Sequence, residues 1–192
     1  MINMNKLRLN LFKDKMTTEF LEQIAGPLAP EVVKLFNNNA LSPEEVSNKL
    51  KQKITLVRST LNSLHYRGIA CYKKQRNEHN MYEFLWEIKY KKIIEILLIQ
   101  EMKKYKKNED NITDKEVRDF FYCTNKCTEV PFEVAAAYDF KCPNCGKNLE
   151  MVNSKKKIND IKKENKKISE NIKSLESILE KIKDNTKGYI CD

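Results

Sequence analysis

The sequence predicts a mostly α-helical fold with a small amount of β-structure. Three observations support this class: apolar residues recur at helical spacing over most of the chain, one stretch near residues 69–88 alternates instead, and glycine (4) and proline (5) are scarce. Breaks in the pattern divide the 192 residues into three parts. We expect an extended helical domain with a hairpin at residues 1–108, a small cysteine-rich module at 119–152, and a lysine-rich helix at 153–187.

The first part should contain four short helices, each with its own start or stop signal. Hydroxyl residues precede the apolar stripe near residues 17–25, and Gly26 ends it. A proline in the first turn marks the second helix. Ser42-Pro43-Glu44-Glu45 predicts a capping box at the start of the third helix, in which Ser42 and Glu45 exchange hydrogen bonds. Thr55 is expected to cap the fourth helix, and Gly68 follows its last turn.

The pattern then changes to that of a β-hairpin. Residues 69–72 are extended in character, residues 73–80 form a polar tip, and residues 81–88 alternate, with one side made of Tyr82, Phe84, Trp86 and Ile88. Helices followed by a hairpin with a basic tip are the plan of a winged helix-turn-helix domain. Helical periodicity returns at residues 89–107 as a linker, and residues 108–111 predict a polar break.

Four cysteines predict a metal site in the second part. They are spaced as Cys123-x3-Cys127 and Cys142-x2-Cys145, and the residues between the pairs could form two strands and a turn. Four thiolates in two close pairs are typical of a tetrahedral Zn²⁺ site that is closed and structural, as in a zinc ribbon. We therefore expect one structural zinc ion, a bulged turn in the longer first pair, and a small core formed by Tyr122, Phe132, Phe140 and Leu149.

The other two cysteines are expected to be reduced. The first residues of the chain do not resemble a secretion signal, and no run of about 18 apolar residues could cross a membrane. Disulfides are rare in the cytosol. We therefore expect a cytoplasmic protein without membrane contact, in which Cys71 is a packed core thiol and Cys191 is left over.

Residues 153–187 carry a heptad repeat. Inward positions alternate in spacings of three and four over four heptads: Ile158, Ile161, Asn165, Ile168, Ile172, Leu175, Leu179 and Ile182. Such a helix either docks on its own protein or forms a coiled coil with a second copy or a partner helix. Because a single inward Asn suits a two-stranded pair, we expect a homodimer or a partner helix through residues 158–182.

The net charge of +9 favours an acidic partner such as nucleic acid, although a lysine-rich surface can also serve solvation alone. The fourth helix offers few side chains that could read bases, whereas the hairpin tip is basic and suited to phosphate contact without sequence preference. Aromatic residues are also enriched at protein interfaces. The candidates for contact with nucleic acid or a protein partner are Arg58, Arg67, Lys73, Lys74, Arg76 and Trp86.

The order of these parts is similar to that of a known family. The cysteine module reads Phe121-Tyr122-Cys123, then Phe132-Glu133-Val134-Ala135, then Phe140-Lys141-Cys142-Pro143-Asn144-Cys145-Gly146 and Leu149. With the helix-turn-helix at residues 42–50 and 57–64 and the strand at 82–86, it resembles archaeal transcription factor E, the counterpart of the alpha subunit of eukaryotic TFIIE. The resemblance covers roughly residues 16–152. The first cysteine pair has one residue more than is usual, and the heptad helix lies outside the family pattern.

The resemblance implies a non-enzymatic role in transcription initiation. Members of this family join RNA polymerase, the TATA-binding protein and a TFIIB-like factor at the promoter. They bind the polymerase clamp and stalk and favour the open promoter. The winged helix lies on the clamp and can touch the non-template strand, and the zinc ribbon lies between clamp and stalk. The candidate contacts named above would then face polymerase or promoter DNA, and the protein would work at the archaeal nucleoid.

Two other functions are compatible with parts of the sequence. A gene-specific repressor would dimerise through the heptad helix and read a palindromic site with two winged helices, but the fourth helix is poor in basic side chains. A redox enzyme, or an iron site of rubredoxin type, would also use paired cysteines. The sequence contains no phosphate loop, paired-carboxylate site or nucleophile motif that would support an enzyme.

Overall fold

The computed structural model describes residues 15–36, 39–76, 80–117, 119–152, 154–182 and 189–191. This part of the chain is mostly helical, with one two-stranded and one three-stranded antiparallel sheet. The chain divides into two compact units, Met1–Leu98 with Leu175–Asp192, and Ile99–Ser174. None of its described helices is long and apolar enough to span a membrane.

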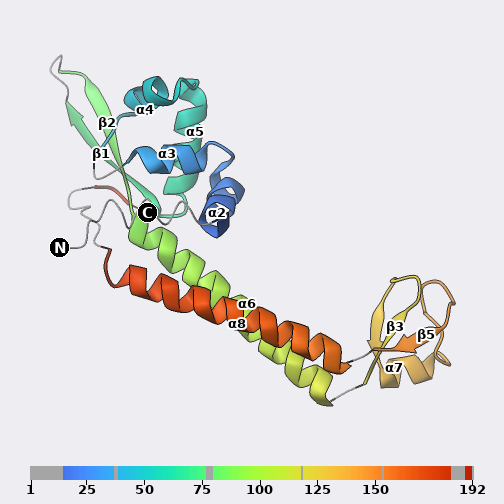
Figure 1. Cartoon of the computed structure of the whole chain (residues 1–192). Coiled ribbons are helices and arrows are strands. Elements are labelled where there is room, and N and C mark those ends of the chain that lie inside the picture. Colours follow the sequence, from blue (N-terminus) through green and yellow to red (C-terminus); the bar gives the residue numbers. More distant parts are fainter. Residues whose placement is uncertain are drawn as a thin grey trace. The chain divides into compact units, whose positions relative to one another are not determined.

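The first unit consists of short helices and a hairpin (Figure 1). Its elements are α2 (Lys15–Ala25), α3 (Ala29–Leu35), α4 (Pro43–Leu50), α5 (Ile54–His65), β1 (Ala70–Arg76) and β2 (Tyr82–Ile88). Gly26 follows α2 with a φ of +85°, and the predicted capping box of Ser42 and Glu45 is present at α4. The predicted cap of α5 is wrong, because Thr55 lies inside the helix, which begins at Ile54, and the N-cap residue Lys53 makes no side-chain cap hydrogen bond.

The hairpin is buried at its base and exposed toward its tip. Tyr72 pairs with Trp86 in the antiparallel register. Along β2, Trp86 and Ile88 are buried, whereas Tyr82 and Phe84 are exposed. The four alternating residues therefore lie on one strand but differ in burial, because only the base of the hairpin packs on the helical core. Residues 77–79 of the expected polar tip lie outside the described residues.

The core of the first unit is closed by Tyr90, at the start of α6 (Tyr90–Val117). Its ring is almost fully buried. Its hydroxyl donates to the carbonyl oxygens of Val33 at 2.8 Å and Phe36 at 3.1 Å, at the end of α3. The Phe36 carbonyl, at the end of the helix, gains a donor in this way, and the Val33 carbonyl, which also accepts from the amide of Phe36 at 3.3 Å, gains a second donor. The start of α6 is thereby fixed to the helices that precede the hairpin.

The predicted polar break at residues 108–111 is wrong, because α6 continues through it to Val117. This stretch contains neither proline nor glycine, so nothing in its covalent structure stops the helix. In the second unit, the side of α8 (Ser154–Leu179) that carries the heptad positions is covered. Asn165 and Ile168 are buried, and the buried carboxylate of Glu101 on α6 accepts a 3.1 Å hydrogen bond from Asn171.

The heptad positions nearer the C-terminus are covered within the first unit. Leu175 and Ile182 are buried in the same apolar cluster as Tyr90, Ile93 and Leu97 of α6. The helix therefore packs against residues of its own chain in both units. The partner expected for the heptad helix is, in the described residues, α6 together with the core of the first unit.

The cysteine module of the second unit contains a three-stranded sheet. Its strands are β3 (Phe120–Cys123), β4 (Glu129–Pro131) and β5 (Leu149–Met151), in the order β4-β3-β5. The two cysteine pairs are separated by β4 and helix α7 (Phe132–Ala137), not by two strands as predicted. The buried residues are Cys123, Ala135, Cys142, Leu149 and Val152, so the predicted core is right for Leu149 alone. Tyr122 is partly exposed and donates a hydrogen bond to Glu150.

Cys71 is not a free thiol. It is fully buried, as predicted, but it forms a disulfide with Cys191, 120 residues further along the chain. The expectation that both residues are reduced is therefore wrong for the structure. The neighbouring residues Tyr72 and Ile190 form an antiparallel bridge, which places the end of the chain along β1.

Candidate metal centre and hairpin groove

The four cysteines of the second unit form a compact cluster. The Sγ atoms of Cys123, Cys127, Cys142 and Cys145 all lie within 4.8 Å of one another. Cys123 ends β3, and Cys142 lies in the turn that precedes β5, so the sheet brings the two pairs together. Cys123 and Cys142 are buried, and their partners Cys127 and Cys145 are exposed. The structure thus assembles all four residues that the spacing predicted.

The two cysteine turns are closed by the same kind of backbone hydrogen bond, although the spacing of their cysteines differs. The amide of Cys123 donates to the carbonyl of Thr128 at 3.0 Å, and the amide of Cys142 donates to the carbonyl of Lys147 at 2.7 Å. Both bonds join residues five positions apart. The extra residue of the first pair is therefore absorbed inside a turn of unchanged length. Lys126 takes a φ of +58° there, as Gly146 does at +72° in the second turn.

Backbone amides are directed at the sulfur atoms. The amide of Asn125 donates to Cys123 Sγ at 3.3 Å. Burial alone would raise the pKa of Cys123, but hydrogen bonds from the amides of Asn125 and Cys127 lower the pKa to about 7. The pKa of Cys127 is raised to about 12, chiefly by its hydrogen bond with Cys145. The cysteine side chains are thus linked to one another by hydrogen bonds.

The geometry of this cluster fits a bound metal ion. Four sulfur atoms bound tetrahedrally at about 2.3 Å would lie about 3.8 Å from one another. The measured separation is 3.4 Å between Cys123 and Cys145 and stays below 4.8 Å for every pair. The four cysteines could therefore hold one metal ion without rearrangement of the backbone. An all-sulfur donor set of this size is consistent with zinc.

A groove of about 780 Å³ lies in the first unit beside the hairpin. We call it the hairpin groove. It is formed by residues of α4, α5, both strands and the residue before β2: Pro43, Glu44, Arg58, Asn62, Tyr72, Met81, Tyr82, Glu83, Phe84 and Trp86. Trp86 is only 7% exposed, and its indole Nε1 is buried without a hydrogen-bond partner in the described structure. The groove therefore has largely aromatic walls, and its charged lining residues are Glu44, Arg58 and Glu83.

The predicted contact residues divide into two groups. Arg58 and Trp86 line the hairpin groove. The Nζ of Lys74 lies 3.7 Å from the ring centre of Tyr82, which also lines it, and Arg76 lies over the same ring at 5.3 Å. Lys73 and Arg67 are exposed but do not line the groove. Successive residues of a strand face opposite sides, which separates Lys73 from Lys74.

Two features of the groove were not predicted. Arg58 forms a 2.7 Å ion pair with Glu44 of the preceding helix, so its charge is partly compensated. Tyr72, Phe84 and Trp86 form a chain of ring contacts with His65, whose Nδ1 lies 2.8 Å from the carbonyl oxygen of Ala70. The alternation in β2 identifies the aromatic face, but only the tertiary structure shows that its outer half is open.

Comparison with known proteins identifies the family. A model of the TFIIE alpha subunit family matches residues 15–118, more than half of the chain. A Transcription factor E from Ignicoccus hospitalis is 30% identical over 163 residues, which cover 84% of this chain and 94% of that protein. Another from Archaeoglobus fulgidus is 29% identical and covers 82% and 92%, respectively.

The similarity also extends beyond the family model. A Transcription factor E from Methanopyrus kandleri is 24% identical over 180 residues, covering 91% of this chain and 95% of that protein. A match of that extent must include the cysteine module and most of α8. The chain belongs to the TFIIE alpha family, a family of transcription factors and not of enzymes.

Proposed function

We propose that this protein is a general initiation factor that binds the clamp and stalk of RNA polymerase and stabilises the open promoter complex. The observation that carries the proposal is the match to proteins named Transcription factor E over more than nine tenths of the length of two of them. The factor would act with the TATA-binding protein and a TFIIB-like factor at promoter DNA. By binding the open state more tightly than the closed state, it would raise the population of open complexes.

The first unit would serve as the winged helix, with the hairpin as its wing. Unpaired bases stack on exposed aromatic rings, and cations beside them contact the phosphates without reading sequence. Phe84 is 44% exposed, and Lys74 and Arg76 lie over the ring of Tyr82. This surface suits the non-template strand of a melted promoter or an acidic face of the polymerase.

The same unit gives little support to a gene-specific repressor. Base readout by a helix-turn-helix needs several free side chains on the second helix. On α5, Arg58 is ion-paired to Glu44, and Nδ1 of His65 lies 2.8 Å from a backbone carbonyl oxygen. The heptad helix that would join two repressor subunits is covered by its own chain. We therefore retain the basal factor as the proposed function.

The cysteine module would hold one zinc ion through Cys123, Cys127, Cys142 and Cys145. With all four positions filled by thiolates the ion has no place for substrate, so its role would be structural. It would replace part of the apolar core that so small a module lacks, since only four residues of the module form its buried cluster.

Open-complex formation on a weak promoter tests the proposal. Purified polymerase, the TATA-binding protein and the TFIIB-like factor would be combined with the zinc-loaded protein, and melted thymines mapped by permanganate. We expect a severalfold gain on duplex DNA and none on a promoter already mismatched over the melted region. Replacement of Lys73, Lys74 and Arg76 by Ala should reduce the gain, whereas replacement of Lys103 and Lys107 on α6 should not.

Retention of polymerase with its stalk subunits on the tagged protein would support the same proposal independently. The absence of both retention and stimulation, with zinc fully loaded, would refute it. Selective binding to one duplex sequence at moderate salt would instead favour a gene-specific regulator.

A further inference from the structure

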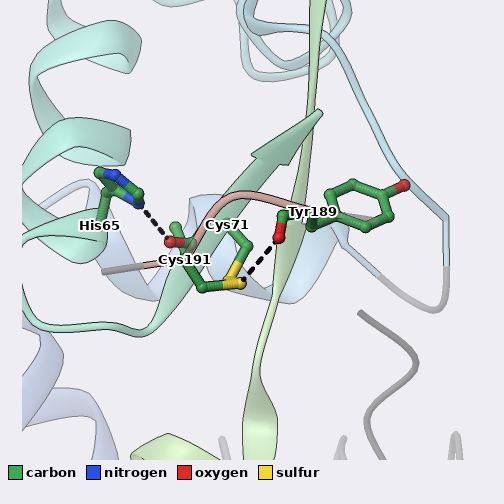
Figure 2. Close-up of a disulfide and its surroundings, with 5 residues drawn as sticks. His65, Cys71, Tyr189 and Cys191 are labelled. Atoms are coloured by element: carbon green, nitrogen blue, oxygen red, sulfur yellow. Dashed lines mark hydrogen bonds between the residues drawn. A yellow bond between two sulfur atoms is a disulfide. The ribbon is translucent and has the colours of Figure 1, made fainter. Parts of the chain in front are cut away.

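The disulfide joins two segments that are far apart in the sequence (Figure 2). Cys71 lies on β1 and is fully buried, and Cys191 is partly exposed near the end of the chain. The sulfur atoms are bonded, with the Cα atoms 4.7 Å apart. The covalent loop closed in this way contains α6, the cysteine module and α8. Two side chains at its ends thus determine whether the chain is linear or closed.

Residues 189–191 lie beside β1, where Ile190 forms an isolated antiparallel bridge with Tyr72; we call this short segment the C-terminal strand. Ile190 donates to the carbonyl of Tyr72 at 2.7 Å and accepts from the amide of Tyr72 at 3.1 Å. β2 pairs with the other edge of β1, so Ile190 pairs with the edge of β1 that no other described strand occupies. The two backbone hydrogen bonds lie next to the disulfide. The disulfide keeps Ile190 opposite Tyr72, and the hydrogen bonds keep Cys191 close to Cys71.

We propose that Cys71 and Cys191 form a redox-sensitive latch that fixes the C-terminal strand on the outer edge of β1. In the oxidised protein the strand is covalently held. In the reduced protein it is held by non-covalent contacts, among them the two hydrogen bonds between Tyr72 and Ile190, which can open locally. The redox state of this pair then decides whether the edge of the sheet is covered. The latch would operate in the protein alone, whatever its role at the polymerase.

The bond between Cys71 and Cys191 can form by thiol–disulfide exchange with a low-molecular-weight disulfide, which accepts the two electrons. The thiolate of Cys191 attacks one sulfur of the small disulfide, and the released small thiolate takes up a proton. The thiolate of Cys71 then attacks Cys191 Sγ and displaces the second small thiolate, which is protonated in turn. Two protein thiols are oxidised to one disulfide, and the small disulfide is reduced to two small thiols.

The burial of the two sulfurs makes the latch asymmetric. A reductant can reach the partly exposed Cys191 but not the fully buried Cys71. Attack at Cys191 would release a Cys71 thiolate inside the core, where an anion is poorly solvated. Reduction should therefore be slow while the strand is paired and should accelerate when the strand opens.

The latch controls a surface that proteins use for pairing. An open strand edge presents unpaired N–H and C=O groups and accepts an additional strand from another segment or chain. Tyr72 lies on this edge of β1 and also lines the hairpin groove. Release of the C-terminal strand would expose the Tyr72 amide and carbonyl next to the groove.

Hydrogen exchange of the full, zinc-loaded chain in glutathione buffers tests the latch. The 71–191 cross-link would be measured by peptide mass spectrometry after thiol alkylation, at a series of ratios of oxidised to reduced glutathione. We expect the cross-linked fraction to rise through the series. The amides of Tyr72 and Ile190 should exchange at least about tenfold faster in the reduced protein.

Cys191→Ser is the matched control, because it removes the bond at the more exposed position. Its Tyr72 and Ile190 amides should exchange at the fast rate in every buffer, while the amide of Val57 in the core stays protected. The zinc content, measured in parallel, reports separately on the cysteine module. The proposal is overturned if no 71–191 cross-link forms in oxidised glutathione. It is also overturned if the bond persists in excess dithiothreitol, or if exchange is the same in both redox states.

Discussion

At the residue scale, removal of the Tyr90 hydroxyl tests how the start of α6 is attached to the end of α3. In Tyr90→Phe the carbonyls of Val33 and Phe36 would lose a donor inside the core. We expect a loss of about 1–3 kcal/mol in the free energy of unfolding, because unpaired buried polar groups are costly. Denaturant titration, followed through spectroscopic signals of the first unit, measures this free energy. Tyr66→Phe is the control, since Tyr66 is 86% exposed, and an equal effect of both changes would contradict the assignment.

The cysteine cluster makes a second prediction at this scale. Cys142→Ser removes one of four converging sulfurs, so zinc content should fall from about one ion per chain to nearly none. The amides of β3 and β5 should lose their protection from exchange, while the first unit remains folded. Metal analysis and amide exchange measure these effects. Cys191→Ser, a change of the same chemistry outside the cluster, should retain the metal, and retention by Cys142→Ser as well would refute the four-cysteine site.

At the scale of single elements, the capping box of α4 carries its own prediction. Ser42 Oγ accepts from the amide of Glu45 at 3.2 Å, and the carboxylate of Glu45 accepts from the amide of Ser42 at 2.7 Å. Ser42→Ala should reduce the free energy of unfolding of the first unit by about 1 kcal/mol. Thermal or denaturant unfolding measures the change. Ser59→Ala, at an exposed position within α5, should change it by less than about 0.5 kcal/mol.

Elements with local signals were predictable from the sequence, and those decided by tertiary contacts were not. The capping box and the cysteine pairs are short patterns whose geometry their own residues determine. The continuation of α6 through residues 108–111 is not predicted, because the polar composition there indicates a break and the helix is decided by its packing. Helix α7 was missed because the expectation of two strands outweighed the helix-favouring Ala135, Ala136 and Ala137. The disulfide partners are 120 residues apart, and no local pattern connects them.

At the scale of the whole molecule, the heptad helix raises the question of oligomeric state. A heptad repeat predicts that its apolar positions are buried against another helix, but it does not say whether that helix belongs to the same chain. In the structure Asn165, Ile168, Leu175 and Ile182 are all buried within one chain. A homodimer formed through the same positions would have to displace those contacts. The same pattern that suggested a coiled coil between chains is therefore satisfied inside one chain.

We therefore expect the full chain to be a monomer in solution, with a mass near 22.6 kDa across a wide concentration range. Ile168→Asp would place a charge where the side chain is now 6% exposed. It should destabilise the second unit by about 3 kcal/mol or more without changing the oligomeric state, because no subunit interface depends on it. Ser174→Asp, at an exposed position of the same helix, is the control. Sedimentation equilibrium decides the matter: a mass that doubles with concentration, and returns to that of a monomer in Ile168→Asp, would show that the heptad face pairs between chains.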